Sequence, residues 1–232
     1  MTKTALVVGA GSGISAAFAR ALHRDGYRIM LAARGVGDLA DLCKETGAQA
    51  HPCDATEPGQ VSALFKAIDR DFGQLDVVLY NASYRTRGPL VELDPAEVKK
   101  SLLASAYGGL LVAQEAVKRM LAQGSGAILF TGASASVKGY ALSAPFAMGK
   151  FALRGLAQSM ARELHPRGIH VAHFVIDGGV RSGQRGRGAG DTAAPDSLLD
   201  PDAIAASYMH VLNQPRSAWT WEIELRPWVE TF

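Results

Sequence analysis

The sequence TALVVGAGSGIS at residues 4–15 is the stretch that predicts the fold. It contains Leu6-Val7-Val8, a short apolar run of the kind that forms a strand buried on both faces. Glycines follow at positions 9, 11 and 13, and from Ile14 onward apolar residues recur with helical spacing. Glycine lets the backbone turn sharply, and the start of a helix offers unpaired N–H groups and the positive end of its dipole. Strand, glycine turn and helix together predict a phosphate-binding site.

The spacing of the glycines narrows this prediction. The common dinucleotide fingerprint fails, because Ile14 stands where its third glycine should be. The spacing that does fit is Gly9-x-x-x-Gly13-x-Ser15. It resembles the nucleotide-binding loop of the short-chain dehydrogenase/reductase family, with Ser15 in place of the family's third glycine. The glycines by themselves leave open a tight turn without a ligand. The resemblance implies cofactor contacts for Gly9, Gly11, Ser12, Gly13 and Ile14.

Length and composition predict an ordinary globular protein. The 232 residues are 48% hydrophobic and 20% charged, which suits one α/β domain over residues 1–232. The formal net charge of +2 gives no reason to expect nucleic acid or a membrane as a partner. The only two cysteines, Cys43 and Cys53, are expected to be reduced thiols in a cytoplasmic protein. We expect no secretion signal, no membrane-spanning segment and no metal site.

Strand and helix patterns alternate along the whole chain. Further strands are predicted at 27–33, 48–54, 75–80, 127–131, 169–176 and 219–225, and helices at 58–72, 94–122, 144–165 and 200–212. This order predicts a Rossmann-like α/β fold, a doubly wound parallel sheet flanked by helices. Residues 182–197 carry no apolar period and are predicted to form a mobile loop. One helix face is predicted to lie in the core: Phe151, Leu153, Leu156, Met160 and Leu164.

The end of the second predicted strand bears on the choice of cofactor. NAD-binding units place an acidic residue near this point, where it holds the ribose 2′-hydroxyl. Here Ala33 is followed by Arg34, whose guanidinium would pair with a 2′-phosphate. The residues therefore favour NADP(H) over NAD(H), and the alternative is a surface arginine in a loop. The family resemblance implies further cofactor contacts after later strands, at Asp54, Asn81, Ala82, Ser83, Gly178, Val180 and Ser182.

The resemblance also implies where the catalytic residues lie. The family uses a tyrosine, a lysine four residues later and an upstream serine. The tyrosine exchanges a proton with the substrate oxygen, the lysine lowers the tyrosine pKa and binds the nicotinamide ribose, and the serine orients the substrate oxygen. Here Lys150 and Ser134 match, but Phe146 takes the place of the tyrosine, and Ser105 takes the place of the asparagine that completes the family's proton relay. The sequence therefore resembles a divergent subgroup without the tyrosine.

Two functions remain open at this stage. The first is an NADP(H)-dependent oxidoreductase that acts on a carbonyl or alcohol. Its proton would come from an unusual donor, of which Tyr140 is the best placed, or directly from water. The second is a non-catalytic NADP(H)-binding protein, which the loss of the phenol at Phe146 favours. Three further candidate donors are more simply explained as packing or surface residues: Tyr84, Tyr107 and Asp177.

Assembly and the substrate pocket also follow from the resemblance. It implies a homodimer or homotetramer that assembles through the helices beginning near residues 94 and 144. Small residues would allow close helix contact there, unless they pack inside the monomer: Ala104, Ser105, Gly108 and Gly109. The substrate pocket is expected to draw on the loops 84–89 and 136–143 and on the segment 182–197.

Overall fold

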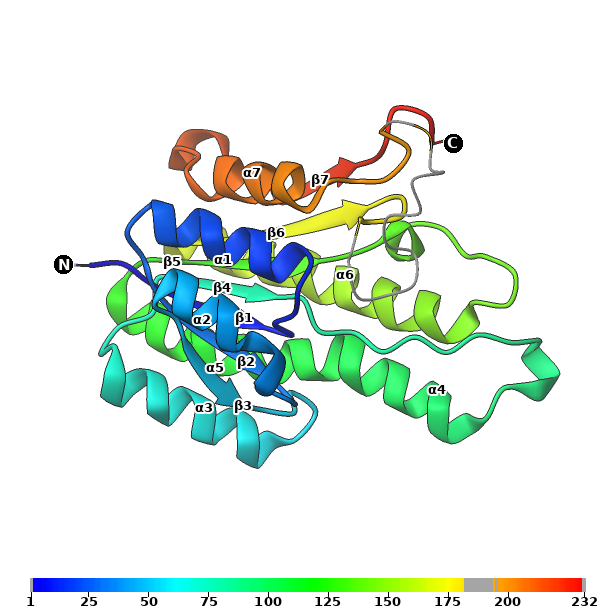
Figure 1. The fold of residues 1–232 in the computed structure, drawn as a ribbon, viewed down its shortest axis with the longest axis horizontal. Coiled ribbons are helices and arrows are strands. Elements are labelled where there is room, and N and C mark those ends of the chain that lie inside the picture. Colours follow the sequence, from blue (N-terminus) through cyan, green and yellow to red (C-terminus); the bar gives the residue numbers. More distant parts are fainter. Residues whose placement is uncertain (1, 182–193, 195, 231–232) are drawn as a thin grey trace.

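The fold is a parallel sheet covered by helices on both faces (Figure 1). A computed structural model describes residues 2–181, 194 and 196–230. Within these residues, seven parallel strands lie in the order β3-β2-β1-β4-β5-β6-β7. The strands are β1 Thr4–Val8, β2 Arg28–Ala33, β3 Gln49–Pro52, β4 Val77–Tyr80, β5 Gly126–Thr131, β6 Ile169–Ile176 and β7 Glu222–Leu225. The predicted doubly wound sheet is confirmed. The strand order reverses between β1 and β4, where doubly wound sheets bind ligands.

Alternate residues of the central strands pack into two hydrophobic cores, one on each face of the sheet. Leu6 and Val8 pack on the face covered by α3, α5 and α6, whereas Ala5 and Val7 pack under α1, α2 and α7. The helices are α1 Ile14–Arg24, α2 Ala40–Thr46, α3 Pro58–Asp71, α4 Pro95–Leu102, α5 Gly108–Gln123, α6 Ala144–Leu164 and α7 Pro201–Leu212. Burial on both faces explains why the central strands are continuous apolar runs.

Three predictions about helices need correction. Helix α2 was not expected, because its seven residues are too few to show a helical period. The single helix predicted at 94–122 is divided into α4, a π-helical segment at Leu103–Tyr107, and α5. Phe151 is 44% exposed rather than in the core, although Leu153, Met160 and Leu164 on the same helix are buried. Most of the predicted loop at 182–197 lies outside the described residues.

The π-helical segment is fixed by contacts inside the chain. A Cβ atom on Gly149 of α6 would lie 2.8 Å from the Ser105 Cβ and 3.2 Å from the Ser101 carbonyl oxygen. Just beyond, a Cβ on Gly108 would lie 2.5 Å from the Tyr80 hydroxyl, which donates to the Ala104 carbonyl at 2.7 Å. Ser105, Gly108 and Gly109 are all buried within the chain. The prediction that these small residues serve contact between subunits is therefore wrong for these three.

Two glycines of α6 make a matched test of this packing. Gly149→Ala should lower the free energy of unfolding by about 1–3 kcal/mol, because the new methyl group meets backbone and a Cβ atom that cannot easily move. Gly155→Ala in the same helix faces open space and should raise it by about 0.5–1 kcal/mol through helix propensity. Urea unfolding measures both, and a stable Gly149→Ala protein would show that the π-helical segment is not held by this contact.

Candidate active site and cofactor cleft

The glycine loop after β1 is shaped by its contact with the end of β4. Gly9 has a positive φ of +79°, and a Cβ atom there would lie 2.4 Å from the Ala82 backbone nitrogen. The Gly9 and Ala10 N–H groups both donate to the Ala32 carbonyl of β2, at 2.9 and 3.0 Å. Only glycine satisfies both the conformation and the close approach. The loop is thereby held at the reversal point of the sheet, between the ends of β2 and β4.

The start of α1 is open to an anion. Its N-cap is Gly13, which offers no side-chain hydrogen bond, and its first turn carries no acidic residue. By contrast, α4 and α7 begin at Asp94 and Asp200, whose carboxylates accept backbone N–H groups. Cβ atoms on Gly11 and Gly13 would meet no neighbour within 4 Å. The first N–H groups of α1 therefore have no side-chain cap, and the residues present fit a bound pyrophosphate.

Ser15 gives a bridge that the family's usual glycine could not provide. Its hydroxyl donates to the Gly9 carbonyl oxygen at 3.0 Å and accepts from the Asn81 side-chain amide at 2.8 Å. Asn81 also donates its backbone N–H to the Val8 carbonyl at 2.8 Å. Ser15 is buried, so these bonds are shielded from water. The departure from the family pattern at Ser15 links β1, α1 and β4.

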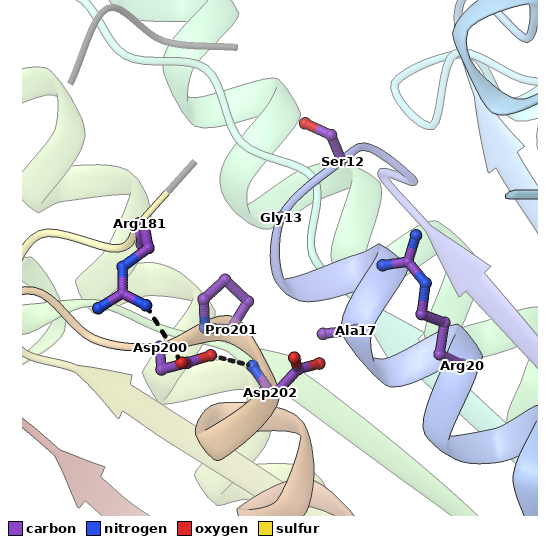
Figure 2. Close-up of a pocket in the computed structure, with 8 residues that line it drawn as sticks. All are labelled: Ser12, Gly13, Ala17, Arg20, Arg181, Asp200, Pro201 and Asp202. Carbon is purple, nitrogen blue, oxygen red and sulfur yellow. Dashed lines mark hydrogen bonds and ion pairs between the residues drawn. The ribbon is translucent and has the colours of Figure 1, made fainter. Parts of the chain in front are cut away.

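A hollow of about 260 Å³ lies beside this loop. Figure 2 shows Arg181 on one side of it and Arg20 on the other, with Ser12 and Gly13 between them. Arg181 pairs with Asp200 at 3.4 Å, and Arg20 pairs with Glu45 at 2.8 Å. The hollow lies between the start of α1 and Arg181. Arg181 directly follows the predicted cofactor residues after β6, Gly178 and Val180. Ser182 lies outside the described residues.

The remaining predicted cofactor residues lie at neighbouring strand ends. Arg34 is exposed just beyond β2 and forms no hydrogen bond or ion pair within the described residues. One oxygen of Asp54 already accepts the backbone N–H and the hydroxyl of Thr56, at 2.9 and 2.8 Å. Ser83 is exposed, as a loop residue after β4. Arg34 is the one of these whose charge has no partner in the described part.

Lys150 belongs to α6, four residues after the position of the family's tyrosine, and its side chain reaches the end of β5. Its Nζ donates to the Thr131 carbonyl oxygen at 2.7 Å, and only 3% of the residue is exposed. Burial lowers the pKa of Lys150 to about 8. The Phe146 ring, one turn earlier on α6, has its centroid 5.8 Å from this Nζ. Ser134 begins a short turn, Ser134–Ser136, that packs against α6. The structure thus brings Lys150, Phe146 and Ser134 to one end of the sheet.

Ser105 and the predicted substitute proton donors have other surroundings. The buried Ser105 hydroxyl has no hydrogen-bond partner among the described residues. The Tyr84 hydroxyl donates to Glu97. The Asp177 carboxylate is buried and pairs with Lys138 at 3.3 Å and Arg226 at 2.9 Å. These contacts explain Tyr84 and Asp177 as structural residues. The two other candidates are largely exposed, Tyr107 at 40% and Tyr140 at 44%.

Two features of the site were missed from the sequence. The Arg85 guanidinium carbon lies 4.9 Å from the Phe146 ring centroid, so two cations approach this ring. Behind Lys150, the buried His173 contacts Glu222 at 3.0 Å, and Arg154 forms two hydrogen bonds to the same carboxylate. Burial lowers the pKa of His173 to about 4, so the ring is neutral at pH 7. Neither feature has a local sequence signal, because both join distant segments.

Comparison with known proteins identifies the family. The model of the short chain dehydrogenase family matches residues 3–185, and the chain belongs to this family. The chain is 32% identical to D-threitol dehydrogenase of Mycolicibacterium smegmatis over 219 residues, which cover 88% of this chain and 84% of that protein.

Solved structures agree with this assignment. A short-chain dehydrogenase from Rhodopseudomonas palustris is 34% identical, with a TM-score of 0.83 over 97% of this chain and 99% of that one. An alcohol dehydrogenase from the archaeon Thermococcus sibiricus, complexed with 5-hydroxy-NADP, is 26% identical, with a TM-score of 0.87 over 100% and 99%. In the described part of the chain, no helix is long and apolar enough to cross a membrane, and no cluster of potential metal ligands occurs.

Proposed function

We propose that this protein is an NADP(H)-dependent oxidoreductase that acts on a carbonyl or alcohol through an atypical active site. The observation that carries the proposal is the preserved cofactor half of the site: the uncapped start of α1 together with the buried Lys150. The related D-threitol dehydrogenase and the NADP-complexed alcohol dehydrogenase support the reaction class. The two free cysteines suit a reducing compartment, and we place the protein in the cytoplasm.

Each part of the site has a role in this proposal. The N–H groups at the start of α1 would hold the pyrophosphate, and Lys150 would donate to the nicotinamide ribose. The bound cofactor supplies or accepts the hydride. Ser134 would orient the substrate oxygen, and its proton would come from a donor other than residue 146, because Phe146 has no ionisable hydrogen. The start of α1 and Lys150 could therefore bind the cofactor even though Phe146 cannot donate a proton.

Arg34 is proposed to select NADP(H). Arg34→Ala should raise the Kd for NADPH by about ten- to a hundredfold, because one charge-assisted pair with the 2′-phosphate is lost. The Kd for NADH should not change. Arg24→Ala is the matched control, since Arg24 lies in the last turn of α1, at the end away from the glycine loop. Fluorescence titration with both cofactors measures these affinities, and an equal loss for NADPH and NADH would refute the 2′-phosphate role.

A non-catalytic NADP(H)-binding protein is the second candidate, and Phe146 is the observation that favours it. General acid catalysis by a positioned side chain contributes about 10²–10⁴-fold in rate. This chain has no general acid at residue 146, and the Ser105 hydroxyl has no hydrogen-bond partner within the described residues. Such a protein could bind NADP(H) without catalysing a reaction.

Restoring the phenol separates the two functions. Phe146→Tyr should raise the rate of NADPH oxidation with isatin, an uncharged dicarbonyl, at least tenfold, because Lys150 and Arg85 would lower the pKa of the new phenol. Tyr140→Phe should leave the rate unchanged, and a fall would place the proton donor at Tyr140. If the parent and both variants bind NADPH but oxidise none of it, the binding function is favoured instead.

We also propose that a second copy of the chain covers the exposed apolar side chains of α6 and the π-helical segment. Tyr107, Met148 and Phe151 are 40%, 51% and 44% exposed. The parent should sediment as a dimer or tetramer at micromolar concentration, and Phe151→Glu should shift it toward monomer. Leu90→Glu is the control, because Leu90 is an exposed apolar residue on another element. A parent that sediments only as a monomer would rule out this assembly.

A further inference from the structure

Arg181 lines the hollow beside the glycine loop. The lining also includes Ser12 and Gly13 on the α1 side and Asp200 at the start of α7 (Figure 2). Ser12 and Gly13 lead into the first turn of α1, where the cofactor pyrophosphate is proposed to bind. The family resemblance implies cofactor contacts for the residues before and after Arg181, but not for Arg181 itself. A positively charged side chain without an assigned role therefore lies beside the proposed pyrophosphate site.

The backbone of Arg181 is fixed, whereas its side chain is loosely held. The Arg181 N–H donates to the Leu199 carbonyl at 2.9 Å, and the Leu199 N–H donates to the Gly179 carbonyl at 2.8 Å. Among the described residues, the guanidinium forms one ion pair, with Asp200 at 3.4 Å, and 52% of the Arg181 side chain is exposed. An exposed pair of this kind contributes only about 0–1 kcal/mol. Arg181 can therefore turn away from Asp200 at little cost, while its backbone stays at the hollow.

Asp200 keeps its other contact when Arg181 turns away. One carboxylate oxygen of Asp200 accepts the Asp202 backbone N–H at 2.8 Å and so caps α7, and the other oxygen contacts Arg181. The Asp200 side chain is 46% exposed, so water can take the place of the guanidinium. The departure of Arg181 therefore leaves neither a buried unpaired charge nor an uncapped helix.

The other arginine of the hollow is held more firmly. The Arg20 Nε donates to both carboxylate oxygens of Glu45, at 2.8 and 2.9 Å. Arg181 has a single contact that is longer than either of these. Of the two arginines that line the hollow, Arg181 is thus the one whose ion pair is more easily exchanged.

The chemistry of Arg181 suits a phosphate group, because the planar fork of N–H donors in a guanidinium matches phosphate oxygens. We propose that Arg181 exchanges its ion pair with Asp200 for the pyrophosphate of the bound cofactor. This inference rests on the proposed cofactor site at the start of α1 and adds a binding residue to it. The pyrophosphate is common to NADPH and NADH. Arg181 therefore strengthens the binding of both cofactors, whereas Arg34 is proposed to select between them.

Cofactor fragments test the contact. Arg181→Gln should raise the Kd for NADPH, NADH and ADP-ribose about tenfold each, because all three carry the pyrophosphate and one charge-assisted hydrogen bond is lost. The Kd for 2′-AMP, which has no pyrophosphate, should not change. Arg167→Gln is the matched control and should alter none of these values, since it removes an exposed arginine before β6, whereas Arg181 follows β6. Calorimetric titration of the full chain measures all four ligands without turnover.

A double-mutant cycle tests the exchange. Asp200→Asn keeps a cap on α7, because asparagine is as good an N-cap as aspartate. It should lower the Kd for NADPH about two- to fivefold, since Arg181 no longer leaves a carboxylate when the cofactor binds. In the Arg181→Gln background the same substitution should give no gain, because no guanidinium is there to be released. A gain of equal size in both backgrounds would show that Asp200 only repels the cofactor, and the exchange would be wrong.

The remaining outcomes separate this proposal from the oxidoreductase function. If Arg181→Gln binds NADPH as tightly as the parent, the contact is overturned while the proposed function stands. A loss confined to NADPH would place Arg181 at the 2′-phosphate and would also overturn the contact. Arg181-dependent binding of NADPH and ADP-ribose by a parent that reduces no isatin would support the contact and reject the oxidoreductase. A parent that binds neither NADPH nor ADP-ribose would overturn both.

Discussion

The rest of the structure depends on the close approach of the glycine loop to the end of β4. With a Cβ position on Gly9 only 2.4 Å from the Ala82 nitrogen, no side chain fits between the two backbones. This contact fixes the position of the loop, and the loop leads directly into α1, whose N-cap Gly13 has no side-chain hydrogen bond. The Ser15 hydroxyl joins the Gly9 carbonyl to the Asn81 amide and so fixes the arrangement from inside. The uncapped start of α1 is therefore placed by backbone packing.

The second half of the site depends on burial. Burial of Lys150 lowers its pKa to about 8. Its Nζ also donates one hydrogen bond, to the Thr131 carbonyl oxygen. In the family, that cation would act on a tyrosine. Here the neighbouring ring belongs to Phe146, and a second cation, Arg85, approaches the same ring. Two positively charged side chains therefore lie beside residue 146, although this residue has no phenol hydroxyl.

The sequence pattern at 94–122 predicted helical residues correctly but did not predict the π-helical segment that divides them. The Asp94 cap and the helical period are present as predicted, since both depend on residues close in the chain. The π-helical segment between α4 and α5 packs instead against α6, a different helix, where Gly149 leaves room for Ser105. The exposed Phe151 has a related cause, because helical spacing does not reveal which apolar residues the sheet covers.

The sequence by itself determined the alternation of strands and helices, the doubly wound sheet and the position of the glycine loop. Its resemblance to the family implied the places of Ser134, Phe146 and Lys150. These follow from apolar periods and short motifs, whose physical causes act within a few residues of the chain. Only the tertiary structure decided what those residues touch. Ser15 and Asn81 meet across 66 residues of sequence, and the Ser101 hydroxyl lies within hydrogen-bond distance of the loop after β4, at Tyr84, and of the first turn of α6, at Pro145. Such contacts arise from the packing of complete layers, and so no local pattern encodes them.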